Sequence, residues 1–272
     1  MTIMCVAERL IMKTEKDDVD MTLNAGSLKV AAPTPPGPAK VLLYGVEGVG
    51  KTTLAAQFPA PLFLDLEGST VKMKPQPARM DDVGGFKELK DQLNQIYNTP
   101  HQYKTLVIDS VSVLDNWVED FVIERAQADN ANINSIEDFG YGKGYTIVEE
   151  EIRKFLDGLD ALIKKRQMHI VLIAHSIIRQ AVEPGMSASY DRYELNLSKK
   201  VAPTIKQWAD AVLFARYHDI IIENKDGTKA KGVRGKDRVL YCNHTATIDA
   251  KNRFGLPDVV PMTIDSLKPL FQ

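Results

Sequence analysis

The sequence predicts an α/β fold in which helices cover both faces of a mainly parallel central sheet. Two observations support this prediction. From Lys40 onward, short apolar segments rich in β-branched residues alternate with amphipathic helical segments. Several of the short segments are apolar at consecutive positions, which is typical of parallel strands buried on both faces. The expected strands cover residues 41–44, 62–66, 105–108, 169–174, 211–215 and 238–242.

A helix is expected between the third and fourth of these strands, because apolar residues recur there at helical spacing. They are Val148, Ile152, Phe155, Leu156, Leu159, Leu162 and Ile163. Nearer the C-terminus, Asp226-Gly227 is typical of the turn in a β-hairpin. We therefore expect a C-terminal hairpin next to the parallel strands.

Residues 1–39 differ in composition from the rest of the chain. They mix acidic and basic side chains and then carry a proline cluster between Pro33 and Pro38. Such a cluster cannot sustain a helix or a central strand. We expect a flexible tail and proline-rich linker over 1–39, followed by one domain over 40–272.

Composition limits the classes of protein to consider. With 44% hydrophobic and 26% charged residues, the chain can bury a core. No apolar run approaches the roughly 18 residues that cross a bilayer, so no membrane role is expected. The two cysteines, Cys5 and Cys242, are far apart, which argues against a disulfide framework or zinc site and favours a cytoplasmic location. Because the net charge is −2, nucleic-acid binding requires local basic patches.

One motif indicates a phosphate ligand. Residues 45–52 read Gly-Val-Glu-Gly-Val-Gly-Lys-Thr, which fits GxxxxGK[ST], and they lie between an expected strand and a helical segment. The glycines let backbone N–H groups point at phosphate oxygens, Lys51 supplies charge to the phosphates, and Thr52 supplies a hydroxyl to Mg²⁺. A chance glycine-rich turn is the alternative, expected in about one chain of this length in a hundred. The expected nucleotide-binding residues are Gly45, Val46, Glu47, Gly48, Val49, Gly50, Lys51, Thr52 and Thr53.

Three carboxylates and a histidine stand at the ends of expected strands. Asp109 is expected to hold a magnesium-bound water, although an Asp at this place also suits a helix cap. Asp65 and Glu67 are one residue apart, and Glu67 is expected to be the general base that activates the attacking water. The alternative is a solvated strand end. His175 is expected to sense the γ-phosphate from its position, with a structural role as the alternative.

Together, these motifs resemble the RecA-like recombinase superfamily over most of residues 40–265. Asp65-Leu66-Glu67 is similar to the family's acidic pair with its catalytic glutamate, and Asp109-Ser110-Val111 to its Walker B ending. His175 stands where RecA proteins carry an Asn-Gln pair, and the segment after it corresponds to their mobile second DNA loop. Ala250-Lys251-Asn252-Arg253 resembles the Lys-Asn-Lys stretch that reaches a neighbouring subunit's nucleotide.

The resemblance implies a RecA-like P-loop core that hydrolyses ATP with Mg²⁺, stimulated by DNA. Its catalytic residues would be Lys51, Glu67 and His175, with Lys251 and Arg253 reaching across an interface. It thus implies a homo-oligomer, ring or filament, with a composite active site. Alternatively, Lys251 and Arg253 are solvated cations on a surface turn.

More narrowly, Tyr141-Gly142-Lys143-Gly144-Tyr145 and the ending AKNRFGLP resemble phage-encoded, Sak-type RecA-like single-strand annealing ATPases. This resemblance implies single-stranded DNA and a single-strand-binding protein as partners, in the host cytoplasm. His175 replaces the family's Gln switch, and the large C-terminal domain of bacterial RecA is absent. Full strand exchange is therefore not expected, whereas annealing or recombination with single strands stays open.

Two basic segments suit single-stranded nucleic acid independently of the family, because cations follow a backbone and aromatic rings stack on bases. The alternative for each is an ordinary solvated loop. Residues 139–145 are a third candidate for base stacking, or a brace for the fold. The first segment carries Arg179, Tyr190, Arg192, Tyr193, Lys199 and Lys200, and the second Lys225, Lys229, Lys231, Arg234, Lys236 and Arg238.

Another class of function stays open, namely a P-loop GTPase or small-molecule kinase without a nucleic-acid role. Residues 65–68 match the GTPase pattern DxxG, but they follow Lys51 too closely and are expected on a different strand from Asp109. The guanine-reading NKxD motif is missing, since Asn224-Lys225-Asp226 lacks the spacer. A nucleotide-gated assembly factor that does not hydrolyse ATP is a third possibility.

Overall fold

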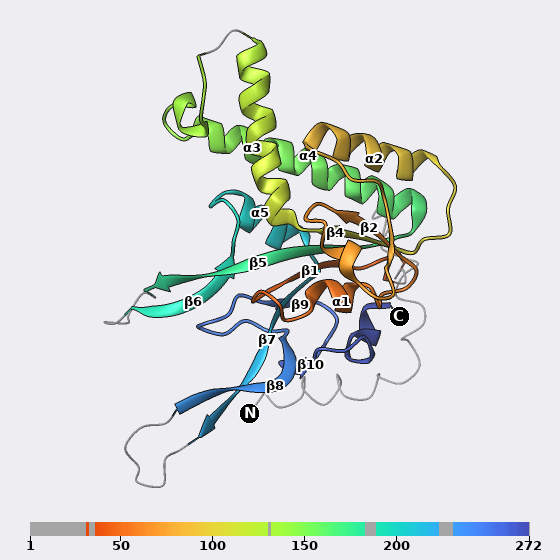
Figure 1. Ribbon diagram of the computed structural model, residues 1–272, viewed down its shortest axis with the longest axis vertical. Coiled ribbons are helices and arrows are strands. Elements are labelled where there is room, and N and C mark those ends of the chain that lie inside the picture. The colour runs from red at the N-terminus through yellow and green to blue at the C-terminus, as the bar shows by residue number, and fades with distance from the viewer. Residues whose placement is uncertain (1–30, 33–35, 130–131, 183–188, 223–230, 272) are drawn as a thin grey trace, which may run out of the picture. The chain divides into compact units, whose positions relative to one another are not determined.

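The computed structural model describes residues 31–32, 36–129, 132–182, 189–222 and 231–271, without the side chains of 219–222 and 231–234. Gly37–Gln272 form one compact unit (Figure 1). Its strands are β1 (Lys40–Gly45), β2 (Pro61–Asp65), β3 (Ala78–Arg79), β4 (Thr105–Asp109), β5 (His169–Ala181), β6 (Tyr190–Leu195), β7 (Ala211–Ile222), β8 (Lys231–Tyr241), β9 (Lys251–Asn252) and β10 (Val259–Pro261). Its helices are α1 (Lys51–Ala55), α2 (Phe86–Asn98), α3 (Val111–Ala128), α4 (Lys143–Arg166) and α5 (Val201–Trp208), with the 3-10 helices η1 (Ser69–Lys72), η2 (Ile136–Phe139) and η3 (Asp265–Phe271).

The strands form one sheet in the order β10-β8-β7-β1-β5-β4-β2-β3, to which β6 and β9 are attached at the side. The strands from β7 to β3 run parallel to one another, whereas β8 and β10 are antiparallel to their neighbours. The carboxyl ends of the parallel strands therefore meet at one edge. In register, Gly45 lies beside His175, and Asp65 lies beside Asp109. This topology confirms the predicted RecA-like α/β fold.

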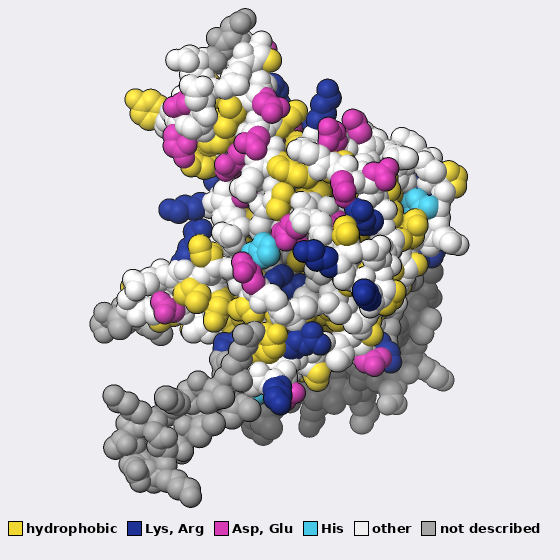
Figure 2. Space-filling model, in the orientation of Figure 1, with side chains coloured by type: hydrophobic (Ala, Val, Ile, Leu, Met, Phe, Trp, Pro, Cys, Tyr) yellow, Lys and Arg dark blue, Asp and Glu magenta, His cyan; other side chains and the backbone are white. Residues whose placement is uncertain are grey.

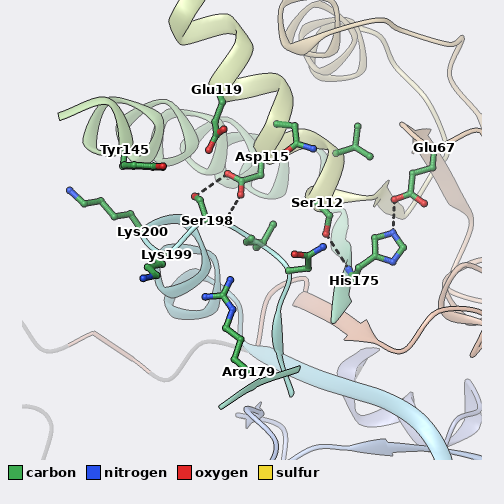
Figure 3. A pocket seen from close by; sticks show the side chains of 14 residues that line it. Glu67, Ser112, Asp115, Glu119, Tyr145, His175, Arg179, Ser198, Lys199 and Lys200 are labelled. Carbon is green, nitrogen blue, oxygen red and sulfur yellow. Dashed lines mark hydrogen bonds and ion pairs between the residues drawn. The ribbon is translucent and has the colours of Figure 1, made fainter. Parts of the chain in front are cut away.

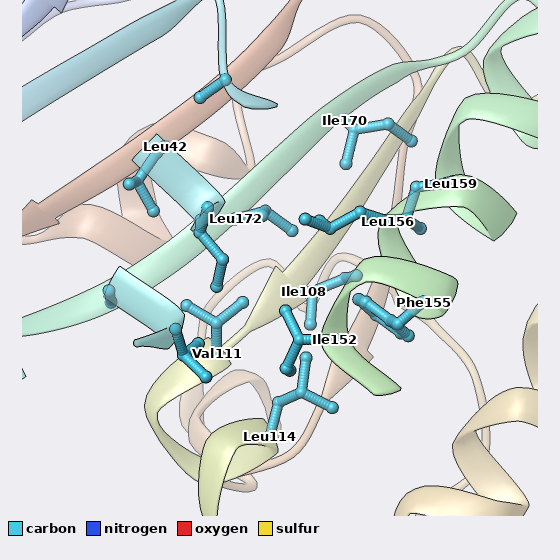
Figure 4. Close-up of a cluster of buried hydrophobic side chains, with 14 of the residues drawn as sticks. Leu42, Ile108, Val111, Leu114, Ile152, Phe155, Leu156, Leu159, Ile170 and Leu172 are labelled. Atoms are coloured by element: carbon cyan, nitrogen blue, oxygen red, sulfur yellow. The ribbon is translucent and has the colours of Figure 1, made fainter. Parts of the chain in front are cut away.

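Apolar side chains cover both faces of the sheet. Along β1, Leu42 and Tyr44 enter a cluster with helices α2 to α5, while Val41 and Leu43 enter a second cluster with α1 and η3. Successive side chains of a strand point to opposite faces, so burial on both faces requires the consecutive apolar residues seen in the sequence. Figure 4 shows part of the first cluster, where α3 and α4 pack on the sheet.

Helix α4 confirms the expected amphipathic helix. Six of its seven predicted core positions are buried, and Ile163 is partly buried against the same cluster. A buried Leu or Phe side chain stabilises the fold by about 1.5–3 kcal/mol, so this face anchors α4 on the sheet. Within the described residues, no helix is long and apolar enough to span a membrane.

Two strands extend well beyond their expected ends. β5 continues to Ala181 and pairs antiparallel with β6, and β7 continues to Ile222 beside β8 (Figure 1). The expectation of a loop after His175 is therefore wrong for residues 176–181 and 190–195, which form a two-stranded ribbon. The expected turn at Asp226-Gly227 and most of the predicted tail and linker lie outside the described residues.

Candidate nucleotide-binding and catalytic site

The phosphate-binding loop connects the end of β1 to the start of α1. Three of its glycines, Gly45, Gly48 and Gly50, have positive φ angles of 153°, 68° and 99°. A Cβ atom on Gly45 would lie 2.0 Å from the carbonyl oxygen of Ala215 on β7. Glycine is therefore required at this position both by conformation and by space.

Lys51 is buried in the loop, with 7% of its surface exposed. Its Nζ donates hydrogen bonds to the carbonyl oxygens of Gly45 (3.0 Å) and Val46 (3.1 Å). Burial lowers the pKa of Lys51, against the opposing effect of the nearby Asp109 and Glu67 carboxylates. A cation held this way is placed to bind phosphate oxygens at the sheet edge.

Asp109 and Thr52 form a set of oxygen donors that fits Mg²⁺. Asp109 is 2% exposed, and its Oδ2 accepts hydrogen bonds from the hydroxyls of Thr52 (2.7 Å) and Ser69 (3.1 Å). Burial raises the pKa of this carboxyl, which a nearby cation would offset. Among the described residues, no group of three or more His, Cys, Asp and Glu side chains could hold a metal. The Thr52 hydroxyl and the Asp109 carboxylate are oxygen donors, the ligand type of Mg²⁺, which takes few protein ligands and completes its shell with water and phosphate.

Glu67 and His175 form a hydrogen-bonded pair beside the loop. The Nε2 of His175 lies 2.8 Å from Oε1 of Glu67 (Figure 3). The same Oε1 also accepts a hydrogen bond from the Ser110 hydroxyl. The hydrogen bond to Glu67 raises the pKa of His175, against the effect of burial. The same bond lowers the pKa of Glu67, again against burial. The carboxylate is thus ionised and partly exposed, as a general base must be.

Asp65 has different partners from Glu67, although the sequence placed them as a pair. Its carboxylate accepts hydrogen bonds from the backbone N–H groups of Ser69 (3.0 Å) and Thr70 (2.8 Å), and from the Thr70 hydroxyl. Asp65 therefore caps the start of η1. β2 ends at Asp65, so Glu67 lies in the following turn, and strand alternation does not apply to it.

A cavity of about 790 Å³ opens next to this pair (Figure 3). Glu67 and His175 line one end, and Tyr145, Arg179, Lys199 and Lys200 also line it. Four of the predicted nucleic-acid residues, Arg179, Lys199, Lys200 and Tyr145, therefore share one cavity with the predicted catalytic pair.

Three serines that were not predicted from the sequence contribute to the site. Ser110 donates to Glu67, the Ser69 hydroxyl donates to Asp109, and the Ser112 hydroxyl accepts a hydrogen bond from the His175 backbone N–H (3.2 Å). Ser110 directly follows Asp109 in sequence, a signal that could have suggested it. The other two depend on where the first turns of η1 and α3 lie in space.

Lys251 and Arg253 lie away from their own P-loop. β9 pairs with Ala211 and Val212 at the amino end of β7. The P-loop residue Gly45 instead lies beside Ala215, which is four residues, about 13 Å, further along β7 than Ala211. Lys251 Nζ donates to the carbonyl oxygens of Lys206, Gln207 and Ala209 at the end of α5, and Arg253 pairs with Asp210 (2.9 Å). Both residues have partners inside the chain, and their expected role between subunits stays a prediction.

Comparison with known proteins adds the family. A sequence model described as an AAA domain matches residues 37–254. The chain belongs to this AAA domain family. Among solved structures, the crystal structure of the RadB recombinase is similar to this AAA domain over 75% of this chain and 80% of that chain, at 14% identity and a TM-score of 0.42. No curated protein matches the chain. The membership supports the expected P-loop ATPase superfamily, while the narrower resemblance to phage annealing ATPases stays a prediction.

Proposed function

We propose that this AAA domain protein hydrolyses ATP with Mg²⁺ and acts on single-stranded DNA in strand annealing or recombination. The observation that carries the proposal is the cavity that joins Glu67 and His175 to Arg179, Lys199 and Lys200. A ligand of the basic side chains would lie beside the residues that activate water. Binding of DNA and turnover of ATP would then influence each other.

The ATP half of the proposal rests on four side chains. Lys51 would bind the phosphates, and Thr52 and Asp109 would hold Mg²⁺, which neutralises phosphate charge when bound. Glu67 would accept the proton of the attacking water, with His175 and Ser110 fixing its carboxylate. This arrangement supports hydrolysis rather than nucleotide binding alone.

The DNA half rests on local groups, since cations do not dominate the surface. On the face seen in Figure 2, Lys and Arg side chains are scattered among carboxylates. The loop before α5, which carries Lys199 and Lys200, is held by Asp115, which accepts hydrogen bonds from the Ser198 N–H (2.6 Å) and hydroxyl (3.3 Å). Asp115 thus positions this loop, and its lysines would contact phosphates.

Tyr141 offers an exposed aromatic ring that can stack on a base. Tyr141 is fully exposed and lies between Gly140 and Gly142, all three with positive φ. The Tyr145 hydroxyl instead donates a hydrogen bond to the Glu137 carboxylate. Residues 143–145 form the start of helix α4. Of the predicted 139–145 segment, Tyr141 is therefore the residue best suited to stack on a base.

The test compares ATP turnover with and without single-stranded DNA, and DNA binding across a range of salt. We expect stimulation by single strands, preference over duplex, and binding that weakens steeply with salt as counterions are released. Lys199→Ala/Lys200→Ala should flatten the salt dependence. The charge-matched control Lys164→Ala/Lys165→Ala, at the far end of α4, should leave it unchanged.

A protein that turns over ATP but binds no oligonucleotide would remove DNA from the proposal. Hydrolysis of GTP in preference to ATP, or phosphoryl transfer to a small molecule, would favour a GTPase or kinase. Nucleotide binding without any turnover would favour the nucleotide-gated assembly factor.

A further inference from the structure

Two side chains of the antiparallel β7–β8 pair contact the outside of the phosphate-binding loop. The Tyr217 hydroxyl donates a hydrogen bond to the carbonyl oxygen of Gly48 (3.2 Å), and Arg238 Nη1 donates to that of Val49 (3.2 Å). Tyr217 and Arg238 are direct partners across the two strands. They therefore form one unit that binds two consecutive carbonyls in the middle of the loop.

These contacts fix the direction of two backbone N–H groups. In a trans peptide, the C=O and the following N–H point in opposite directions. When Gly48 C=O points at Tyr217, the N–H of Val49 must point away from it. When Val49 C=O points at Arg238, the N–H of Gly50 must likewise point away from Arg238. Within the described residues, neither N–H donates a hydrogen bond.

The first residues of the loop are held differently. The N–H of Val46 donates to the carbonyl oxygen of Ala215 on β7 (3.2 Å), so it is not available to a ligand. The carbonyl of Val46 accepts from Lys51 instead. The start of the loop is thus bound to β7 through the N–H of Val46, whereas its middle is bound to β7 and β8 through the carbonyls of Gly48 and Val49. Of these two segments, only the middle one leaves N–H donors for an anion.

We propose that Tyr217 and Arg238 are positioning residues of the nucleotide site, which aim the Val49 and Gly50 N–H groups at the phosphates. The inference rests on the proposed nucleotide binding. It also gives Arg238 a different role from the nucleic-acid contact expected from its basic segment. Arg238 packs against Gly50, where an added Cβ would lie 2.5 Å from its Nη1, so the loop and the guanidinium fit each other closely.

The experiment measures Kd for Mg-ADP and for inorganic pyrophosphate, together with KM and kcat for ATP, in Tyr217→Phe and Arg238→Gln. We expect each variant to raise both Kd values and KM about 3- to 10-fold, which is the value of one hydrogen bond. Because the loop binds phosphate alike in the ground and transition states, kcat should change less than about 2-fold. Tyr241→Phe, which removes a hydroxyl from the next strand, should leave both Kd values unchanged.

Two further readouts separate positioning from other roles. The Kd of Arg238→Gln divided by the wild-type Kd should be the same at low and high salt. If this ratio falls to one at high salt, Arg238 acts through its charge, which would overturn its assignment as a positioning residue. A loss for Mg-ADP without a loss for pyrophosphate would mean contact with the nucleoside, and would also overturn the proposal. If wild-type protein binds no nucleotide, the proposed function itself fails; if it binds and Tyr217→Phe binds equally well, only this inference fails.

Discussion

Glu67 and His175, 108 residues apart in the chain, meet at 2.8 Å at the edge of the sheet, where β2 has ended and β5 continues outward. Neither residue lies in the phosphate-binding motif, and both line the cavity that Arg179, Lys199 and Lys200 also line. Their pairing means that the protonation of one side chain changes the basicity of the other.

The first prediction concerns Glu67. Glu67→Gln removes the base but keeps the shape and a hydrogen-bond acceptor, so the Kd for Mg-ATP should stay within about 3-fold while kcat falls about 10²- to 10⁴-fold. Single-turnover kinetics and nucleotide titration measure the two quantities. Turnover at the wild-type rate would contradict the assignment and make Asp65 the candidate.

The capping role of Asp65 gives this prediction an internal control. Asp65→Asn weakens bonds to Ser69 and Thr70 at the start of η1. Asn keeps one acceptor oxygen and loses the other, which costs the value of one hydrogen bond, about 1 kcal/mol, so thermal unfolding should shift to lower temperature. Below that temperature, kcat should fall much less than in Glu67→Gln.

A second prediction separates phosphate binding from metal binding. Lys51→Ala should abolish ATP hydrolysis and raise the Kd for Mg-ATP at least about 10-fold, because a charged hydrogen bond is lost. Asp109→Ala should lose the magnesium-dependent part of turnover. Titrating each variant with Mg²⁺ at fixed ATP tests the difference. A normal magnesium response in Asp109→Ala would leave that residue only its bonds to Thr52 and Ser69.

The third prediction is a pH dependence of stability. His175 has a raised pKa and Glu67 a lowered one, so the charged pair stabilises the fold fully between about pH 4.5 and 6.5. This stability is lost as pH rises through the pKa of His175, and as pH falls through that of Glu67. His175→Gln keeps a neutral donor, so the variant should be less stable by about 0.5–1 kcal/mol near pH 6 and nearly equal to wild type near pH 9. Urea unfolding across this range measures the difference, and a pH-independent difference would rule out the charged pair.

A fourth prediction tests whether the active site is completed between subunits. Mixing Lys51→Ala chains with Lys251→Ala/Arg253→Ala chains should restore part of the activity, because some interfaces combine an intact P-loop with intact cations. A mixture of Lys51→Ala with Glu67→Gln is the control, since both changes damage the same chain's site. Specific activity should also rise with protein concentration.

Because Lys251 caps the end of α5, its loss also affects the fold. Unfolding curves of the double variant therefore accompany the mixing experiment. No rescue by variants that remain folded, with specific activity constant on dilution, would show that both cations act only within their own chain.

Much of the core was predictable because burial on two faces leaves a strong pattern. The apolar runs at Val41 and Leu106 predict β1 and β4 nearly to their ends. The outer parts of β5 and β7 were not predicted, since strands outside the core lack long buried runs; Ile178 and Gln180 of β5, for example, are both exposed. Register is also invisible in sequence, so neither the Tyr217–Arg238 pair nor the meeting of Glu67 with His175 could be derived from it.

The continuity of β5 connects the core to the ribbon mechanically, because β5 is one uninterrupted strand from His169 in the core to Ala181 in the ribbon. His175 stands at the point where the strand leaves the sheet, and Arg179 is four residues, about 13 Å, further along. The β5–β6 ribbon thus begins directly after the histidine and belongs to the same strand. A displacement of the ribbon would therefore be transmitted along the continuous backbone of β5 to His175, and from there to Glu67 through one hydrogen bond.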